Sequence, residues 1–192
     1  MSSSFILRLA RSEDIGRIIE IKEASVKIMH SEGNFQWGAD YPTAVHFETD
    51  IVEGTLWVVV LLDGNAEEDG AAGAGTTRTI TEVVVAFGAL TLDQPAEYAD
   101  AGCDLSKECV VPHRLAVDPL RRGVGAAAAL FKKAEDLSFD KGFDGLVRVD
   151  TNKVNKAMQG LLTKLGYEFL NEISLAGKPS DMRFVCFEKN KR

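Results

Sequence analysis

The feature that most constrains this chain is a glycine-containing turn between an apolar strand and a helix, within LAVDPLRRGVGAAAALF, residues 115–131. The run from Leu115 to Val117 is apolar and Asp118-Pro119 follows it, which favours a strand that ends in a turn. Gly123 and Gly125 lack a Cβ, so the backbone there can bend tightly and approach a ligand closely. The alanines that follow are strong helix formers, so the turn leads into a helix N-terminus, where free N–H groups and the helix dipole favour phosphate.

Two other nucleotide-binding motifs resemble this turn in part. A Walker A loop requires Gly-Lys-Ser/Thr, whereas alanines follow Gly125. Residues 123–128 do fit the dinucleotide fingerprint G-x-G-x-x-A, and Asp150 ends the next apolar run, where a ribose-binding acid is expected. Against that fingerprint, residues 118–122 separate the strand from the first glycine, two arginines precede the glycines, and little chain remains for further βαβ units. An NAD-binding oxidoreductase and a purely structural turn stay as minor alternatives.

The stretch resembles motif A of the GCN5-related N-acetyltransferases, the GNAT superfamily of acetyl-CoA-dependent enzymes. That motif is written Q/R-x-x-G-x-G/A, and Arg122, Gly125 and Ala127 fill its three defined positions. The likeness is densest over residues 113–169. Within it, residues 155–167 (NKAMQGLLTKLGY) resemble the family's later motif, in which an Asn starts a helix that closes with L-G-F/Y. The resemblance implies an α/β fold with a mixed, mostly antiparallel central sheet that is splayed between its two central strands and flanked by helices.

The resemblance implies an acetyl-CoA site built on the glycine turn. The cofactor's diphosphate would lie on the amides of residues 124–127, and its pantetheine arm would pair with the edge of residues 115–117 like an added strand. Asn155 falls on the Asn that in relatives often hydrogen-bonds the cofactor, although a helix N-cap is an equal alternative for this residue. The implied cofactor-binding residues are Leu115, Ala116, Val117, Arg122, Gly123, Val124, Gly125, Ala126, Ala127 and Asn155.

The resemblance also implies an N-acetyltransferase in which a primary amine attacks the thioester directly in a ternary complex. A base must take the amine's proton. His113 is the first candidate, because it titrates near neutrality and lies on the strand beside the expected thioester, with Glu82 and Glu108 as weaker candidates. A backbone N–H near Val117 would stabilise the oxyanion. Many relatives protonate the departing thiolate with a Tyr, but the aligned residue here is Leu162, so a non-catalytic acyl-CoA sensor stays open.

The acceptor is expected beside residues 34–42 (NFQWGADYP), which are aromatic, polar and without period. A loop is the expected state, and the resemblance implies that it forms one wall of the acceptor site. Trp37 and Tyr41 are the candidate substrate-binding residues, and with Asp40 they would suit a small cationic amine. Packing against the core is an equal alternative for both aromatic residues. The acceptor, whether a small-molecule or a peptide amine, stays open.

The remaining pattern predicts a single domain over residues 1–192. Strands are expected over residues 5–10, 56–62, 80–92, 109–117, 146–149, 168–175 and 182–188, and helices after Ser12, over 47–51, after the glycine turn and over 152–165. Pro112 requires that its strand be an edge or contain a bulge. Residues 63–79 are low in complexity and without a large apolar side chain, which predicts a mobile insertion or a long hairpin tip with no chemistry of its own.

Composition restricts the partners. A net charge of −7 argues against broad nucleic-acid binding, so an anionic cofactor must meet a local basic patch. The three cysteines show no C-x-x-C spacing, which predicts neither a disulfide framework nor a metal site and indicates a cytoplasmic protein. No apolar run is long enough for a membrane span, and a homodimer stays open. The basic residues nearest the turn in sequence are Arg121, Arg122, Lys132, Lys133, Lys153 and Lys156.

Overall fold

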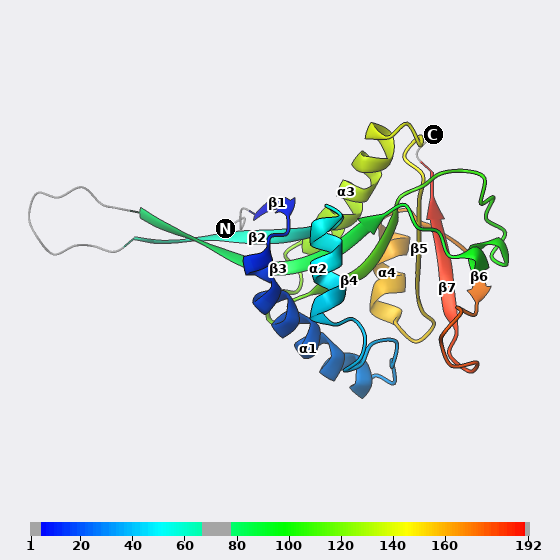
Figure 1. The fold of residues 1–192 in the computed structure, drawn as a ribbon, viewed down its shortest axis with the longest axis horizontal. Coiled ribbons are helices and arrows are strands. Elements are labelled where there is room, and N and C mark those ends of the chain that lie inside the picture. The colour runs from blue at the N-terminus through cyan, green and yellow to red at the C-terminus, as the bar shows by residue number, and fades with distance from the viewer. Residues whose placement is uncertain (1–4, 67–77, 191–192) are drawn as a thin grey trace, which may run out of the picture.

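The computed structural model describes residues 5–66 and 78–190. Four strands form one antiparallel sheet in the order β1-β2-β3-β4, and three form a second in the order β5-β7-β6 (Figure 1). No helix in the described ranges is long and apolar enough to cross a bilayer. The elements in chain order are β1 (Phe5–Leu9), η1 (Ser12–Asp14), α1 (Ile15–Ser31), α2 (Ala44–Val52), β2 (Leu56–Ala66), β3 (Arg78–Thr91), η2 (Ala96–Ala99), β4 (Val111–Val117), η3 (Pro119–Arg121), α3 (Ala126–Asp140), β5 (Val147–Asn152), α4 (Lys156–Lys164), β6 (Glu168–Ile173) and β7 (Phe184–Lys189).

The two sheets meet at one isolated parallel bridge, between Val110 and Val147. Its hydrogen bonds run from the N–H of Val110 to the oxygen of Leu146 and from the N–H of Arg148 to the oxygen of Val110, both at 3.1 Å. Beyond this bridge no ladder joins β4 to β5 within the described residues. The mixed, mostly antiparallel sheet is therefore splayed between its two central strands, which confirms the expected fold class.

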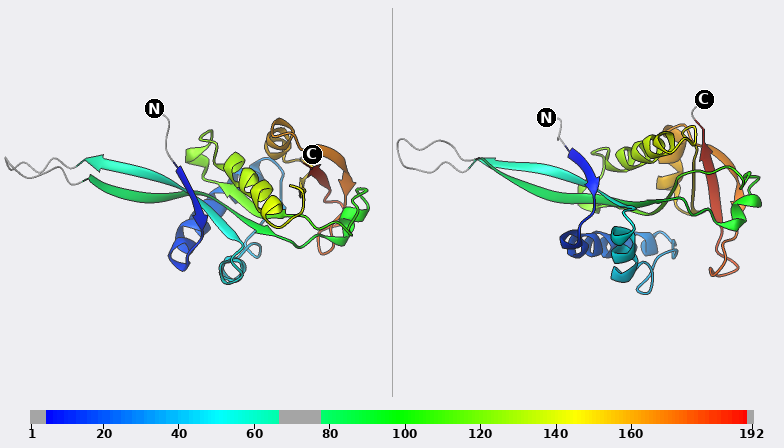
Figure 2. Two further views of the ribbon diagram at one scale, coloured as in Figure 1. Left: turned by 90° about the horizontal axis from the view of Figure 1, so that it is seen from above. Right: turned by 45° about the horizontal axis from the view of Figure 1, so that its top comes forward.

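Helices cover both faces of the first sheet, because alternate side chains of a strand point to opposite faces. Val58 and Val60 of β2 pack in a cluster with α1 and α2, whereas Val59 and Leu61 pack in another with α3. Figure 2 shows α1 and α2 on one side of this sheet and α3 on the other. Burying each such side chain stabilises the fold by about 1.5–3 kcal/mol, so this double-sided core holds α1 and α3 firmly against β4.

The strands of the β2–β3 hairpin are longer than the sequence pattern predicts. Their ladder continues to the pair Ala66 and Arg78, so the strands include residues 63–66 and 78–79 of the segment expected to be an insertion or a hairpin tip. The backbone ladder simply extends past the apolar segment, because backbone pairing does not require apolar side chains. The paired arm projects away from the rest of the protein (Figure 1). Residues 67–77, the remainder of the predicted insertion, lie outside the described residues.

Strand β4 contains a bulge at the point where the site forms. Arg114 and Leu115 together stand opposite the single residue Gly88 of β3. Arg114 has a φ of 49°, which is uncommon for a residue with a Cβ. β4 is also the last strand of its sheet, so Pro112 satisfies both expectations, an edge and a nearby bulge. A bulge leaves one residue out of the ladder and re-aims the side chains beside it.

Two element boundaries differ from expectation near the end of β5. This strand runs on to Asn152, which pairs with Phe184 of β7, so α4 begins only at Lys156. The predicted helix over residues 152–165 is therefore too long at its N-terminus. Asn155 is its N-cap, and its side-chain oxygen accepts from the N–H of Met158 at 3.1 Å. Asn155 therefore caps this helix.

Candidate active site

A cavity of about 510 Å³, the larger cavity, opens between the glycine turn, β4, α1 and α4. It lies where the sheets separate, so no strand pairs with this edge of β4 in the described part of the chain. One wall comes from α1, the floor from β4, and the opposite wall from α4. Its lining residues are Ser25, Ile28, Met29, Glu32, Gln36, Trp37, Leu115, Ala116, Val117, Arg122, Gly123, Gly125, Ala126, Ala127, Ala128, Asn155, Ala157, Met158, Leu161, Lys164 and Leu165.

The glycine turn presents backbone donors to this cavity. Gly125 is the N-cap of α3 and has a φ of 85°, a left-handed conformation that glycine adopts without strain. The first intrahelical bond runs from the N–H of Ala129 to the oxygen of Gly125, at 3.0 Å. The amides of residues 126–128 therefore have no acceptor within the helix. Gly123 and Gly125 are exposed, so the turn is open to a ligand.

An ion pair holds the glycine turn in place. The buried carboxylate of Asp118 accepts from the N–H of Leu120 at 2.9 Å and pairs with the guanidinium of Arg17 from α1. The N–H of Asp118 donates to the oxygen of Val85 at 2.8 Å, and Nε of Arg17 donates to the oxygen of Val84 at 3.3 Å. These bonds tie the start of the turn to β3 and α1 at once. The orientation of the amides that follow is therefore set by the folded core.

Every predicted cofactor-binding residue except Val124 lines the larger cavity. Val124 is half-buried and packs against the apolar cluster that includes Leu130. Only its backbone is left for a ligand, because the side chain anchors the turn to the core.

The predicted basic patch is largely engaged elsewhere. Lys132 pairs with Asp136 one helical turn away, Lys153 pairs with Glu172 at 2.6 Å, and Lys133 lies over the ring of Trp57. Of the six basic residues named from the sequence, only Arg122 lines the larger cavity. Lys164 of α4 lines it as well, and the sequence pattern did not indicate this residue. Proximity in sequence to the glycine turn did not predict which basic side chains line the cavity.

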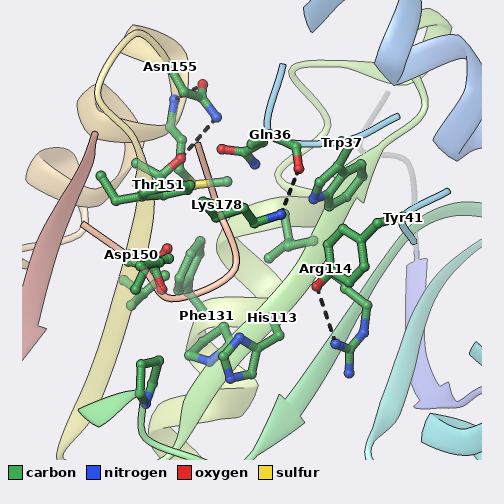
Figure 3. Close-up of a pocket in the computed structure, with 17 residues that line it drawn as sticks. Gln36, Trp37, Tyr41, His113, Arg114, Phe131, Asp150, Thr151, Asn155 and Lys178 are labelled. Carbon is green, nitrogen blue, oxygen red and sulfur yellow. Dashed lines mark hydrogen bonds between the residues drawn. The ribbon is translucent and has the colours of Figure 1, made fainter. Parts of the chain in front are cut away.

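A smaller cavity, of about 160 Å³, adjoins the larger one (Figure 3). Both are lined by Gln36, Trp37, Leu115, Asn155 and Met158, so they meet at the bulge of β4. The remaining lining residues of the smaller cavity are Tyr41, Pro95, Pro112, His113, Arg114, Phe131, Val149, Asp150, Thr151, Leu175, Lys178 and Phe184.

A histidine and a carboxyl group, His113 and Asp150, line the smaller cavity together with the titratable side chains of Tyr41, Arg114 and Lys178. His113 Nε2 lies 3.2 Å from the oxygen of Asp93. A carbonyl only accepts, so this bond places a proton on Nε2 and leaves Nδ1 of the neutral ring as an acceptor. Burial lowers the pKa of His113 below its usual range, against an opposing effect of Asp150. Burial also raises the pKa of the Asp150 carboxyl, which accepts from the hydroxyl of Tyr98 at 2.8 Å.

Arg114 points from the bulge towards α2, where its charge is matched. Its Nε and a terminal nitrogen donate to both oxygens of the buried Asp50 carboxylate, at 2.8 and 2.5 Å. Its other terminal nitrogen lies 3.5 Å from the hydroxyl of Tyr41. This bidentate pair holds a strained residue in the left-handed region, at a typical cost of about 1–3 kcal/mol.

Lys178, in the loop between β6 and β7, reaches across to residues 34–42 (Figure 3). Its Nζ donates to the oxygen of Gln36 at 3.2 Å and lies 4.5 Å from the centre of the Tyr41 ring. The Gln36 side-chain oxygen accepts from the N–H of Asn152 at 3.0 Å. The expected loop over residues 34–42 is thus fixed to the second sheet, and it forms a wall of both cavities. Trp37 lines both cavities and Tyr41 the smaller one.

Glu82, a candidate base from the sequence, lies away from the site. It belongs to β3 next to β2, and its carboxylate pairs with Arg8 at 3.1 Å. It lines neither cavity. We therefore correct this assignment: β3 reaches the site at Gly88, opposite the β4 bulge, but Glu82 lies six residues earlier in that strand and outside the site.

Two residues of the later motif are part of the core. Leu162 is fully buried, and Tyr167 is 3% exposed with its ring 5.4 Å from that of Phe131. Neither lines a cavity, so neither side chain is placed to donate a proton to a ligand there. Cys109 is likewise buried, and burial raises the pKa of its thiol to about 11, which keeps it protonated.

A splayed sheet with a helix N-terminus at its opening defines the class of this chain as an acetyltransferase fold. The model of the acetyltransferase (GNAT) family matches residues 28–167, and the chain belongs to this family. All named strand pairs are antiparallel, whereas a dinucleotide-binding sheet is mostly parallel, so the NAD-binding alternative is not supported.

Solved structures of the family resemble the whole chain. An acetyltransferase of the GNAT family from Streptococcus agalactiae 2603 shares 27% identity, with a TM-score of 0.69 over 98% of this chain and 96% of that one. An N-acetyltransferase from Staphylococcus aureus Mu50 has a TM-score of 0.60 at 18% identity, over 98% and 99%. The yncA protein of Salmonella typhimurium, solved with its cofactor acetyl-CoA, has a TM-score of 0.60 at 15% identity, over 97% and 93%. No curated protein matches the sequence.

Proposed function

We propose that the protein is an acetyl-CoA-dependent N-acetyltransferase that moves an acetyl group to a primary amine by direct attack in a ternary complex. The observation that carries this proposal is the junction of two cavities at the β4 bulge. The larger cavity offers backbone amides and Arg122 for a diphosphate, and the smaller one offers titratable side chains for an acceptor. A relative of the same fold was solved with acetyl-CoA, which supports the choice of cofactor.

Acetyl-CoA would lie along β4 with its diphosphate on the amides of residues 124–127. Those amides have no helical acceptor, and the dipole of α3 adds a favourable field for a phosphate. The unpaired edge of β4 would take the pantetheine arm as an added strand. The thioester would then reach the lining shared by both cavities, near Leu115 and Trp37.

The reaction needs a donor for the developing oxyanion. The expected donor near Val117 lies in the larger cavity only, whereas Leu115 lines both. We therefore place the oxyanion at a backbone N–H of the bulge formed by Arg114 and Leu115, where one residue stands outside the ladder. Such a donor contributes about 3 kcal/mol in other acyl-transfer sites.

His113 is the proposed base. Its Nδ1 takes one proton from the acceptor ammonium, and the neutral nitrogen attacks the thioester carbon. As the C–S bond breaks, the nitrogen loses its second proton to solvent, which leaves a neutral amide. The electron pair leaves on sulfur as CoA thiolate. Leu162 occupies the place of the general-acid Tyr, so the thiolate leaves without a proton from that position, which a thiol pKa near about 8.5 permits.

Release of free CoA thiol, measured across a panel of primary amines, tests this function. Acetyl-CoA at about 100 times its dissociation constant should stabilise the fold by about 2.7 kcal/mol, which a thermal melt detects.

Arg122→Gln should weaken the binding of acetyl-CoA about fivefold or more, because it removes a charge that lines the larger cavity. Arg121→Gln, a neighbouring exposed arginine outside both cavities, is the matched control and should bind normally.

Buried Leu162 also favours a second candidate, a GNAT-fold sensor that binds acyl-CoA without turnover. Stabilisation by acetyl-CoA with no thiol release from any amine would establish the sensor. Absence of both effects would contradict either function.

A further inference from the structure

We propose that the acceptor is a small amine that also carries a carboxylate, namely an amino acid or a close analogue, and that Lys178 binds this carboxylate. The inference rests on the proposed acetyl transfer and specifies its substrate class. It follows from the charges that line the smaller cavity, from what already occupies its aromatic wall, and from its size.

The charge at Lys178 is available to a ligand. Its ammonium has no carboxylate oxygen within 4 Å in the described part of the chain, although its charge acts at longer range on the pKa of Asp150. It donates a hydrogen bond to the neutral oxygen of Gln36. A lysine ammonium has three donors, so two remain. Arg114, the other cation of this cavity, is matched by both oxygens of Asp50. Lys178 is therefore the cation in the lining whose charge is not matched by a paired carboxylate.

The aromatic wall is unsuited to a cationic acceptor group, contrary to the expectation from the sequence. Lys178 itself lies 4.5 Å from the centre of the Tyr41 ring, where a ligand cation would otherwise bind. Asp40, the acid invoked for such a cation, is exposed and does not line the cavity. A second cation placed here would meet the ammonium of Lys178, whereas an anion would be attracted to it.

His113 and Asp150 form the part of the cavity suited to the amine. Both line it together with Lys178, and they come from the two strands that separate, β4 and β5. Asp150 attracts an arriving ammonium and His113 Nδ1 accepts its proton. A ligand with an ammonium at one position and a carboxylate at another matches this arrangement, and an α-amino acid carries both.

The volume of the cavity restricts the acceptor further. Sites for drug-sized ligands usually measure about 300–1,000 Å³, and this cavity has 160 Å³. A free amino acid suits that space better than a polyamine or a folded protein segment.

The experiment compares each amino acid with its own amide as acceptor, for example glycine with glycinamide and L-leucine with L-leucinamide. Initial rates of thiol release give kcat/KM for each, and the ratio of acid to amide is determined in every variant. Lys178→Met should lower this ratio about 10- to 100-fold, since a charge-assisted bond is lost. Differences in basicity between the two amines are the same in every variant, so they cancel when the ratio of a variant is compared with that of the wild type. Any general loss of activity from the broken contact to Gln36 cancels within the ratio itself.

Two control variants accompany it. Lys178→Arg keeps the positive charge and should retain most of the ratio, whereas Lys141→Met removes an exposed lysine at the end of α3 and should leave the ratio unchanged. Equal losses for acid and amide in Lys178→Met would assign Lys178 to tethering the loop and would overturn the inference. A wild-type preference for the amides that Lys178→Met does not alter would overturn it too.

A melt of the CoA-bound protein separates failure of this inference from failure of the proposed function. If no amine is acetylated but L-leucine stabilises the complex more than L-leucinamide, in a manner that requires Lys178, the carboxylate site stands and the transferase fails. If thiol release occurs without the Lys178-dependent ratio, the transferase stands and the carboxylate site fails.

Discussion

His113 owes its proposed role to one hydrogen bond and to burial. The carbonyl of Asp93 fixes the proton on Nε2, and burial lowers the pKa, so the ring is neutral at pH 7 with Nδ1 free to accept. Once Nδ1 of His113 is protonated, the ring can no longer accept a proton from the acceptor amine. The kcat/KM of the enzyme should therefore fall as pH decreases through a value below the ordinary histidine range of about 6.5.

His113→Gln should reduce kcat/KM by about 10²–10⁴-fold and remove this acid limb from the pH profile, because Gln retains a donor for Asp93 but cannot act as a base. Glu82→Gln removes one of the weaker sequence candidates, which pairs with Arg8, and should leave the profile in place. If His113→Gln keeps its acid limb and Asp150→Asn loses it, the carboxyl is the base.

The positions of single residues could be predicted from the sequence where a local motif determines the backbone conformation. Gly125 and Asn155 could be assigned because a turn and a helix cap each demand particular residue types locally. Lys178 and Asp150 could not, because only the folding of β6 and β7 against β5 brings them to one cavity. Arg114 did interrupt an apolar strand, and that departure from alternation was a signal that could have marked the bulge.

The turn before α3 combines two demands on one element. It must leave its amides unpaired for a ligand, and it must keep its position without the hydrogen bonds that those amides could have made. The second demand is met by Asp118 and Arg17, which join the turn to β3 and α1.

The boundaries of elements were harder to predict than their existence. Strand β5 continues to Asn152 because it pairs with β7, and Phe184, the partner of Asn152 in β7, lies 32 positions further along the chain.

Gly125→Ala should weaken acetyl-CoA binding at least tenfold and lower stability by about 1–2 kcal/mol. The strain comes from a φ of 85°, and the added Cβ meets no protein atom within 4 Å, so it projects into the open space of the larger cavity. Calorimetric titration and a melt measure the two effects separately. Gly142→Ala, at the other end of α3 with a φ of 81° and equally open space, should show similar strain but normal affinity. Equal affinities in both variants would contradict the diphosphate site.

At the scale of the whole molecule, the two cavities and the projecting β2–β3 arm are independent of each other. Every lining residue lies in residues 25–41 or 95–184, so the arm contributes none of them among the residues described.

The splay between the sheets could be predicted from the glycine turn, since that motif occurs in a fold with this opening. The length of the arm could not, because its strands continue beyond the apolar pattern.

Replacement of residues 67–77 by Asn-Gly should preserve acetyl-CoA affinity and activity. Ala66 and Arg78 are a ladder pair, and a two-residue Asn-Gly loop closes such a pair in a hairpin. Kinetics and a melt on the shortened chain test this prediction. A loss of activity without loss of stability would show that the arm takes part in catalysis or in recognition of the acceptor.

The single bridge between Val110 and Val147 leaves the rest of β4 without a neighbour on one side. A bare strand margin of this kind is a template on which another polypeptide can pair, and proteins normally shield it. Here the shield would be the coenzyme itself. A bound coenzyme would then do more than deliver its acyl group: by occupying the margin it would also protect the folded protein against self-association.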